Sequence, residues 1–234
     1  MNDIAKFLKK LQQYHLPSVF NPWSDFDPEL DISPAAPEIR SAQLQQYLKL
    51  RLNKVRYLFI AEAVGYQGGR FSGIPLTSER ILLGHHPRVR PEAVIGTQGI
   101  RTSNPACFRL NPTEQAQGMA EPTATIVWGT LLGRGLDPES FVFWNIFPFH
   151  PYKPKSTGGF LSNRTPSPAE LECGAELFKE FRRLFPKARI FAVGRQADLT
   201  LQKMGLVATH LPHPANGHAN QFRAAVGEDI KSSN

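Results

Sequence analysis

Cysteine is scarce in this chain. Only Cys107 and Cys173 occur among its 234 residues, so one chain cannot build a disulfide framework or a four-thiolate site for a metal or an iron–sulfur cluster. The sequence therefore excludes small disulfide-stabilised scaffolds. Reduced thiols in a cytoplasmic protein are the expectation.

The chain also lacks an apolar run that is long enough to cross a bilayer. Its first residues, MNDIAKFLKKLQQYHL, place Ile4, Phe7, Leu8 and Leu11 at helical spacing with lysines between them. This pattern is typical of an amphipathic helix and not of a signal peptide. We expect a soluble monomer with no membrane contact.

Acidic residues are outnumbered by basic ones. Lys and Arg total 27 against 20 Asp and Glu, which gives a formal net charge of +7 and a pI near 9.6. This excess favours a polyanionic partner such as DNA, although many soluble proteins are mildly basic. Phosphate-binding loops with GxxxxGKS, GxxxxGKT or GxGxxG spacing are absent, so the glycine-rich stretch AEAVGYQGG is weak support for a nucleotide-binding fold.

Hydrophobic periodicity switches repeatedly between strand and helix spacing. Apolar β-rich runs predict strands at 55–61, 140–146, 188–194 and 207–210, and helical spacing predicts helices at 3–14, 37–53, 77–84, 122–134, 195–204 and 219–231. A further helix begins after Ser167, because Pro168 suits a first turn and Glu170 completes a capping box. The proline-rich stretch 15–37 is expected to wrap the surface, and 85–111 to form a long loop.

Alternating strands and helices predict a three-layer α/β/α fold with a central, mainly parallel four-stranded sheet. We expect one domain over residues 1–234, with 1–53 as an N-terminal helical extension packed on it. Ligand loops of such folds lie at the carboxyl ends of the strands. The segments after the first, second and fourth predicted strands should therefore meet at one edge of the sheet.

These three segments contain short motifs in a definite order. The first holds Ala61-Glu62-Ala63-Val64-Gly65 and then Gly73-Ile74-Pro75-Leu76-Thr77-Ser78-Glu79, the second begins at Asn145, and the third contains His213-Pro214-Ala215. Over residues 55 to 226 this order resembles the uracil-DNA glycosylase superfamily. The resemblance implies a monofunctional glycosylase of DNA base-excision repair, which flips a uracil or a related deaminated base and hydrolyses its N-glycosidic bond without a metal or other cofactor.

The resemblance assigns base recognition to Asn145 and leaving-group stabilisation to His213. An amide offers a donor and an acceptor, so it can pair with the adjacent N–H and carbonyl of uracil, which is read outside the helix after flipping. A histidine facing the uracil carbonyl would stabilise the negative charge that develops there. The remaining predicted base-binding positions are Ala63, Gly65 and Leu76.

The acid that positions the attacking water is unresolved between Glu62 and Glu79, with a slight preference for Glu79. Ala63 stands where relatives often have an Asp or Asn that orients water, so it leaves this role to another residue. Leu76 replaces the usual stacking phenylalanine, which changes the floor under the base. Each acid taken alone has a plainer explanation as a helix cap or a surface ion-pair partner.

DNA contacts are expected from the same loops. The segment His213 to Gly217 would be the minor-groove loop, with Asn216 or His218 in place of a bulky wedge, and the lysines and arginine after Asn145 would meet phosphates. The full predicted set is Pro75, Lys153, Lys155, Arg164, Pro214, Ala215, Asn216, Gly217 and His218.

Two other functions remain open at this point. The spacing His210-x-x-His213 is compatible with two metal ligands and so suggests a metal hydrolase as an alternative function, although no HExxH motif or acidic partner motif accompanies it. Because Ala63 and Leu76 replace the usual water-orienting and stacking residues, the second alternative is a non-catalytic DNA-binding protein that retains the glycosylase fold.

Overall fold

The computed structural model describes residues 3–154, 157 and 159–231. Its central sheet has the strand order β3-β2-β5-β6, and every neighbouring pair is parallel. These strands are β2 (Tyr57–Ala63), β3 (Phe141–Phe147), β5 (Arg189–Val193) and β6 (Thr209–Leu211). The predicted three-layer α/β/α fold is confirmed, and the sheet is parallel throughout.

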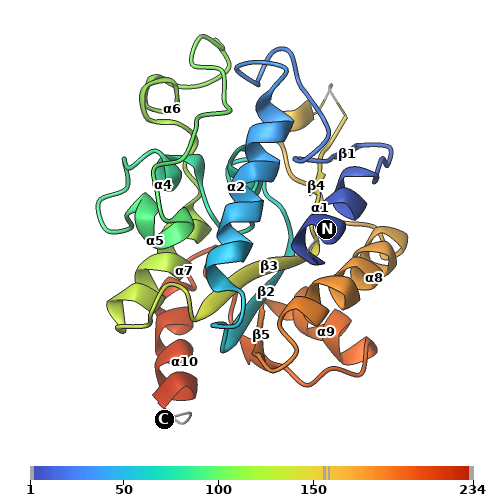
Figure 1. Cartoon of the computed structure of the whole chain (residues 1–234), viewed down its shortest axis with the longest axis vertical. Coiled ribbons are helices and arrows are strands. Elements are labelled where there is room, and N and C mark those ends of the chain that lie inside the picture. The colour runs from blue at the N-terminus through green and yellow to red at the C-terminus, as the bar shows by residue number, and fades with distance from the viewer. Residues whose placement is uncertain (1–2, 155–156, 158, 232–234) are drawn as a thin grey trace.

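Helices cover both faces of this sheet. Figure 1 shows α8 (Pro168–Leu184) and α9 (Arg195–Lys203) on one side, and α7 (Pro122–Gly133) and α10 (Ala219–Lys231) on the other. The N-terminal helices α1 (Asp3–Gln12) and α2 (Ala36–Arg51) join the same hydrophobic core through buried side chains such as Phe7 and Tyr47. The shorter helices are α3 (Gly69–Ser72), α4 (Glu79–Leu82), α5 (Pro91–Ile95), α6 (Pro112–Gln117) and the 3-10 helix η2 (Gly159–Leu161).

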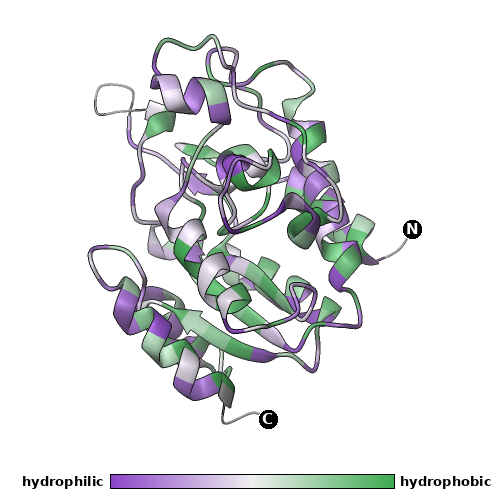
Figure 2. Cartoon of the chain, turned by 90° about the vertical axis from the view of Figure 1, so that its left-hand side faces the viewer, coloured by the Kyte–Doolittle hydropathy of each residue, from purple (hydrophilic) through white to green (hydrophobic). Residues whose placement is uncertain are grey.

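Local sequence explains the element boundaries. All seven residues of β3 are buried, as expected of a strand covered on both faces, and Figure 2 colours the strands mainly hydrophobic while the long helices show both colours. The α8 capping box is present, because the Ser167 side chain accepts from the Glu170 backbone and Glu170 accepts from the Ser167 backbone. Predicted helix 77–84 is shorter in the structure, and the predicted loop 85–111 includes α5.

The proline-rich stretch before α2 is more buried than the surface position expected from its sequence. Trp23 is 2% exposed and donates from Nε1 to the Gly73 carbonyl at 3.0 Å. Asp31 lies between Arg40 and Arg70, and its Oδ1 accepts from the Nη1 groups of both, at 2.9 Å and 2.6 Å. Because all three charged groups are buried, their pairing offsets a desolvation cost that each would otherwise carry alone.

This buried ion group fixes the loop after β2. Burial alone would raise the pKa of Asp31, but the two guanidinium groups outweigh it and hold that pKa below its ordinary value. Arg70 belongs to α3, which begins at Gly69, directly after Gly68. The first predicted functional loop is therefore anchored to the N-terminal part of the chain. Among the described residues, no helix combines the length and apolar content that a membrane span needs.

Candidate active site

A cavity of about 640 Å³ opens where β2 ends. The end of β2 and the following turn form one wall, and the loop after β6 forms another. A second hollow of about 490 Å³ shares several wall residues with it. The cavity is lined by Ala61, Glu62, Ala63, Val64, Gly65, Leu76, Glu121, Thr123, Lys153, Asn163, Arg164, Thr165, Pro166, His213 and Ala215.

The first motif supplies much of this wall. Ala63, Gly65 and Leu76, all predicted to bind the base, line the cavity. Leu76 has a left-handed backbone with φ of 51° and is 5% exposed. Its side chain therefore gives the cavity wall a small aliphatic surface instead of an aromatic ring. Pro75 is buried, which leaves little surface for the DNA contact predicted for it.

Glu62 faces the cavity and has few partners. The residue is half-buried, and its Oε1 atom is buried without a hydrogen bond to any described residue. Burial raises the pKa of its carboxyl group, because removal from water penalises the charged form. A carboxylate in this state can accept a proton from a water molecule held in the cavity.

Glu79 lies outside the cavity wall, contrary to the preference for it as the water-positioning acid. Its Oε1 accepts from the backbone N–H groups of Thr102 and Ser103 at 2.7 and 2.9 Å, and its Oε2 accepts from the Ser103 hydroxyl at 2.5 Å. Oε2 also accepts from the Met119 N–H at 3.2 Å. The carboxylate therefore joins the long loop after α4 to the segment before α7, and its lone pairs are already occupied.

Asn145 combines deep burial with an unpaired amide. It is 1% exposed, and neither its Oδ1 nor its Nδ2 has a hydrogen-bond partner among the described residues. In the sheet it pairs in register with Ala61, which lines the cavity, although Asn145 is not itself part of the lining. Buried amides in folded proteins are nearly always hydrogen-bonded, so the unpaired donor and acceptor of Asn145 are suited to bind a ligand.

His213 holds one ring nitrogen as an acceptor. Its Nδ1 accepts from the Ala215 backbone N–H at 3.2 Å, and this interaction places the proton of a neutral ring on Nε2. Desolvation by the surrounding protein lowers the pKa of His213, although the ring is exposed to the cavity. A Cβ atom at Gly194, which has φ of 92°, would lie 3.2 Å from the His213 Cβ, so the end of β5 lets the histidine approach closely.

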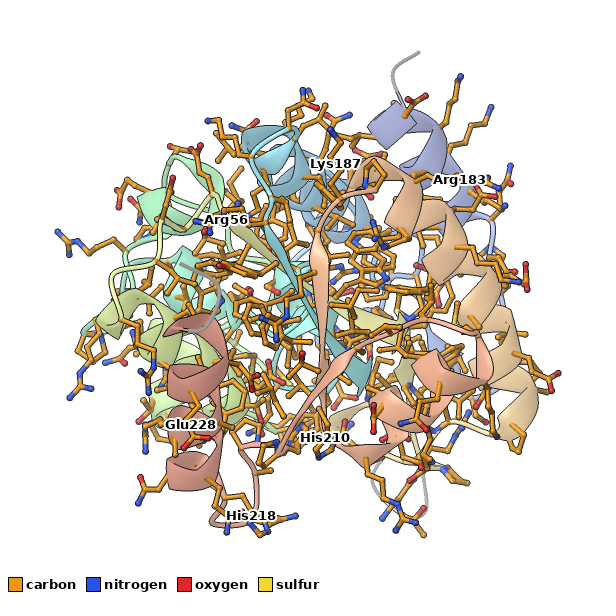
Figure 3. All side chains as sticks on the ribbon, turned by 90° about the horizontal axis from the view of Figure 1, so that it is seen from below. Arg56, Arg183, Lys187, His210, His218 and Glu228 are labelled. Atoms are coloured by element: carbon orange, nitrogen blue, oxygen red, sulfur yellow. The ribbon has the colours of Figure 1, made fainter. Side chains whose placement is uncertain are left out.

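The rest of the loop after β6 has mixed exposure. Pro214 is buried, whereas Asn216, Gly217 and His218 are exposed, and Asn216 and Gly217 form a tight turn with φ of 56° and 87°. His218 contacts Gln221 Oε1 at 2.8 Å, and Figure 3 shows it at the outer edge of the molecule, before α10.

The metal-hydrolase alternative gains no support from geometry. His210 Nδ1 lies 3.5 Å from Asp198 Oδ2, and His210 is not part of the cavity wall to which His213 contributes. In the part of the chain that the structure describes, no three His, Cys, Asp or Glu side chains form a group able to hold a metal ion.

The predicted phosphate contacts divide into three cases. Lys153 is exposed and lines the cavity. Lys155 lies outside the described residues. Arg164 forms a two-pronged ion pair with Glu170 at 2.7 and 2.6 Å and also donates to the Ser18 carbonyl at 3.1 Å. That guanidinium stabilises the start of α8, so the structure does not support a free phosphate-binding role for it.

Glu121 was not expected at this site from the sequence. It precedes Pro122 at the start of α7, where an acid is ordinarily explained as a helix N-cap. The available signal, a carboxylate next to a first-turn proline, predicts the helix boundary and says nothing of the cavity. Asn163 also lines the cavity and accepts from the Tyr66 N–H at 3.0 Å, which ties the second loop to the first.

Comparisons with known proteins support the fold. No protein-family model matches the chain, and no curated protein matches it significantly. Among solved structures, the chain is similar to wild-type SMUG2 from Pedobacter heparinus, with a TM-score of 0.62 and 15% sequence identity. The match covers 99% of this chain and 97% of the SMUG2 chain. At this identity, the likeness establishes a shared fold over nearly the whole length.

Proposed function

We propose that this protein is a DNA glycosylase that hydrolyses the N-glycosidic bond of uracil or a related deaminated base in DNA. The observation that carries the proposal is the buried, unpartnered amide of Asn145 beside the cavity wall. A flipped uracil would pair its N–H and carbonyl with this amide. Cytosine presents a different arrangement of hydrogen-bond donors and acceptors to this amide, so one buried polar group would be left unpaired, at a cost of about 1–3 kcal/mol.

Two cavity residues supply the chemistry. With Nδ1 occupied as an acceptor and no described residue bonded to Nε2, the Nε2–H of His213 can donate to the base carbonyl where charge develops. Glu62 would hold the attacking water and accept its proton as the oxygen adds to the sugar carbon. The products are a free base and an abasic site. The mechanism needs no covalent intermediate, and strand cleavage is not expected.

DNA would approach over the loop after β6. The exposed turn formed by Asn216 and Gly217 and the adjacent His218 suit a groove contact, and Lys153 at the cavity edge suits a phosphate contact. The excess of basic residues favours the same partner. Its fold, shared with SMUG2, is consistent with this assignment.

The test is base release from a panel of oligonucleotides, each with one uracil or other deaminated base, followed by alkali to reveal abasic sites. We expect excision by the wild-type protein, persisting in excess chelator, and a decrease of about 100-fold or more for Asn145→Ala and His213→Ala. His85→Ala, an exposed histidine outside the cavity, is the matched control. Full activity in both site variants would refute the assignment. Salt-sensitive DNA binding without abasic sites would favour a non-catalytic DNA-binding protein.

A further inference from the structure

Glu121 is the second carboxylic acid in the wall of the cavity. It lies immediately before α7 and makes no side-chain hydrogen bond to the start of that helix. Its Oε2 atom is buried without a partner among the described residues. The side chain lines both the main cavity and the adjoining hollow, so it faces the space that the proposed function assigns to the base.

The first glycine-bearing loop is shaped around this carboxyl group. A Cβ atom at Gly68 would collide with Glu121 Oε2, and one at Gly65 would lie 3.5 Å from Oε1. The absence of a side chain at Gly68 allows the acid to lie against the loop backbone, whereas the spacing at Gly65 is an ordinary van der Waals contact. This close packing keeps water away from the Oε2 side of the carboxyl group.

Few charged groups are available to balance a negative charge there. The other titratable or charged side chains that line the main cavity are Glu62, Lys153, Arg164 and His213. Arg164 is paired with Glu170, and His213 favours its neutral form because desolvation lowers its pKa. No ion pair to Glu121 occurs among the described residues.

Glu121 is half-buried, with its Oε2 atom removed from water and no compensating charge beside it, and this changes the protonation of its carboxyl group. Desolvation raises the pKa of this carboxyl group to about 7, because the buried anion is costly. Near neutral pH, a large fraction of molecules therefore carry a proton on Glu121. An acid with a pKa near the working pH is well suited to proton transfer.

We propose that Glu121 is a further catalytic residue of this site, the general acid that protonates the departing base. This role rests on the proposed glycosylase function. As the bond between the sugar carbon and the base nitrogen breaks, its electron pair moves to the base, which takes the proton from Glu121. Water adds its oxygen to the sugar carbon and gives a proton to Glu62. Solvent then reprotonates Glu121 and deprotonates Glu62, which restores both groups.

Two carboxyl groups in different environments can divide these tasks. Glu62 lies at the end of β2 and Glu121 at the start of α7, so they reach the cavity from different elements. His213 would still stabilise charge on the base carbonyl through a hydrogen bond. Glu121 adds a proton that leaves with the product, which lowers the barrier most for bases that depart poorly as anions.

The experiment compares wild type, Glu121→Gln and Glu92→Gln in single-turnover excision of uracil from about pH 5 to about pH 9. Glutamine keeps the shape but cannot transfer a proton. Glu92 is an exposed acid in the first turn of another helix, α5, and serves as the matched control. We expect the wild-type and Glu92→Gln rates to fall as pH rises through about 7, and Glu121→Gln to be at least about 10-fold slower without that decline.

Thermal unfolding provides a readout that does not depend on activity. A carboxyl pKa that is raised in the folded state makes the fold less stable as pH rises from the ordinary value of 4.5 to about 7. Glu121→Gln should remove this part of the pH dependence. Excision with the same rate and pH profile in wild type and Glu121→Gln would refute the role of Glu121 alone. Absence of excision by the wild type would refute the glycosylase function and this role with it.

Discussion

The unpaired amide of Asn145 allows fold stability and function to be separated by one substitution. Asn145→Leu replaces a buried amide with an apolar group of similar size. Neither polar atom of Asn145 has a partner among the described residues, so the change removes a desolvated group and breaks no hydrogen bond. We expect this variant to lose base excision while its free energy of unfolding stays the same or increases.

The size of the increase follows from the cost of a buried, unsatisfied polar group, which is about 1–3 kcal/mol. A water molecule entering from the cavity would satisfy one of the two atoms, so we count one group. For a protein of this length, each kcal/mol corresponds to a rise in melting temperature of roughly 2–4 °C. Chemical denaturation gives the free energy directly, and its slope should be unchanged.

Asn21 provides the matched control, because it is a buried amide with its partners present. Its Nδ2 donates to the carbonyls of Leu11 and Tyr14 at 2.8 and 2.9 Å, and its Oδ1 accepts from the Trp23 N–H at 3.0 Å. Asn21→Leu should cost at least about 1–3 kcal/mol. If Asn145→Leu is destabilised as much as Asn21→Leu, the Asn145 amide has a structural partner and our reasoning is wrong.

Three further predictions concern the carboxyl groups. Glu62→Gln should reduce excision by roughly 100-fold or more, because it removes the proposed proton acceptor, with a melting temperature at neutral pH no lower than that of the wild type, because burial raises the pKa of this carboxyl group; retention of the wild-type rate would exclude that role. Glu79→Ala should lower the free energy of unfolding by roughly 2–5 kcal/mol, since the buried N–H and hydroxyl of Ser103 lose their acceptor; a variant that is stable but inactive would point to catalysis instead. Glu170→Gln should lower the melting temperature at neutral pH. The hydrogen bond from Arg164 holds the pKa of Glu170 below its ordinary value of 4.5, so this stabilisation is present above that pH and is lost as pH falls through the lowered pKa. A difference in melting temperature that is independent of pH would contradict this account.

The elements of the fold were largely predictable because their signals are local. Three of the four strands of the central sheet are short apolar runs, and the helix after Ser167 has its cap, its first-turn proline and its capping-box acid within four residues. These signals come from residues that are close together in the chain, so they can be recognised without knowing the tertiary structure. Because the strands are parallel, their carboxyl ends lie at the same edge of the sheet, and the three loops that follow them meet there.

The roles of the polar residues were not predictable in the same way. Glu62 and Glu79 are equivalent candidates in the sequence, but the backbone that binds Glu79 comes from residues 102, 103 and 119. Arg164 resembles a free loop cation until its ion pair with Glu170 is seen. These partners depend on how distant loops pack.

The sequence alone therefore determined the layered α/β/α fold, the order of its candidate functional loops, and Asn145 and His213 as candidates within them. Only the tertiary structure decided that Glu79 is occupied as a structural acceptor, that Glu62 faces a cavity, and that Glu121 joins it there. The physical reason is that secondary structure follows local periodicity, whereas the charge and hydrogen-bonding state of a side chain depend on which distant atoms exclude water from it.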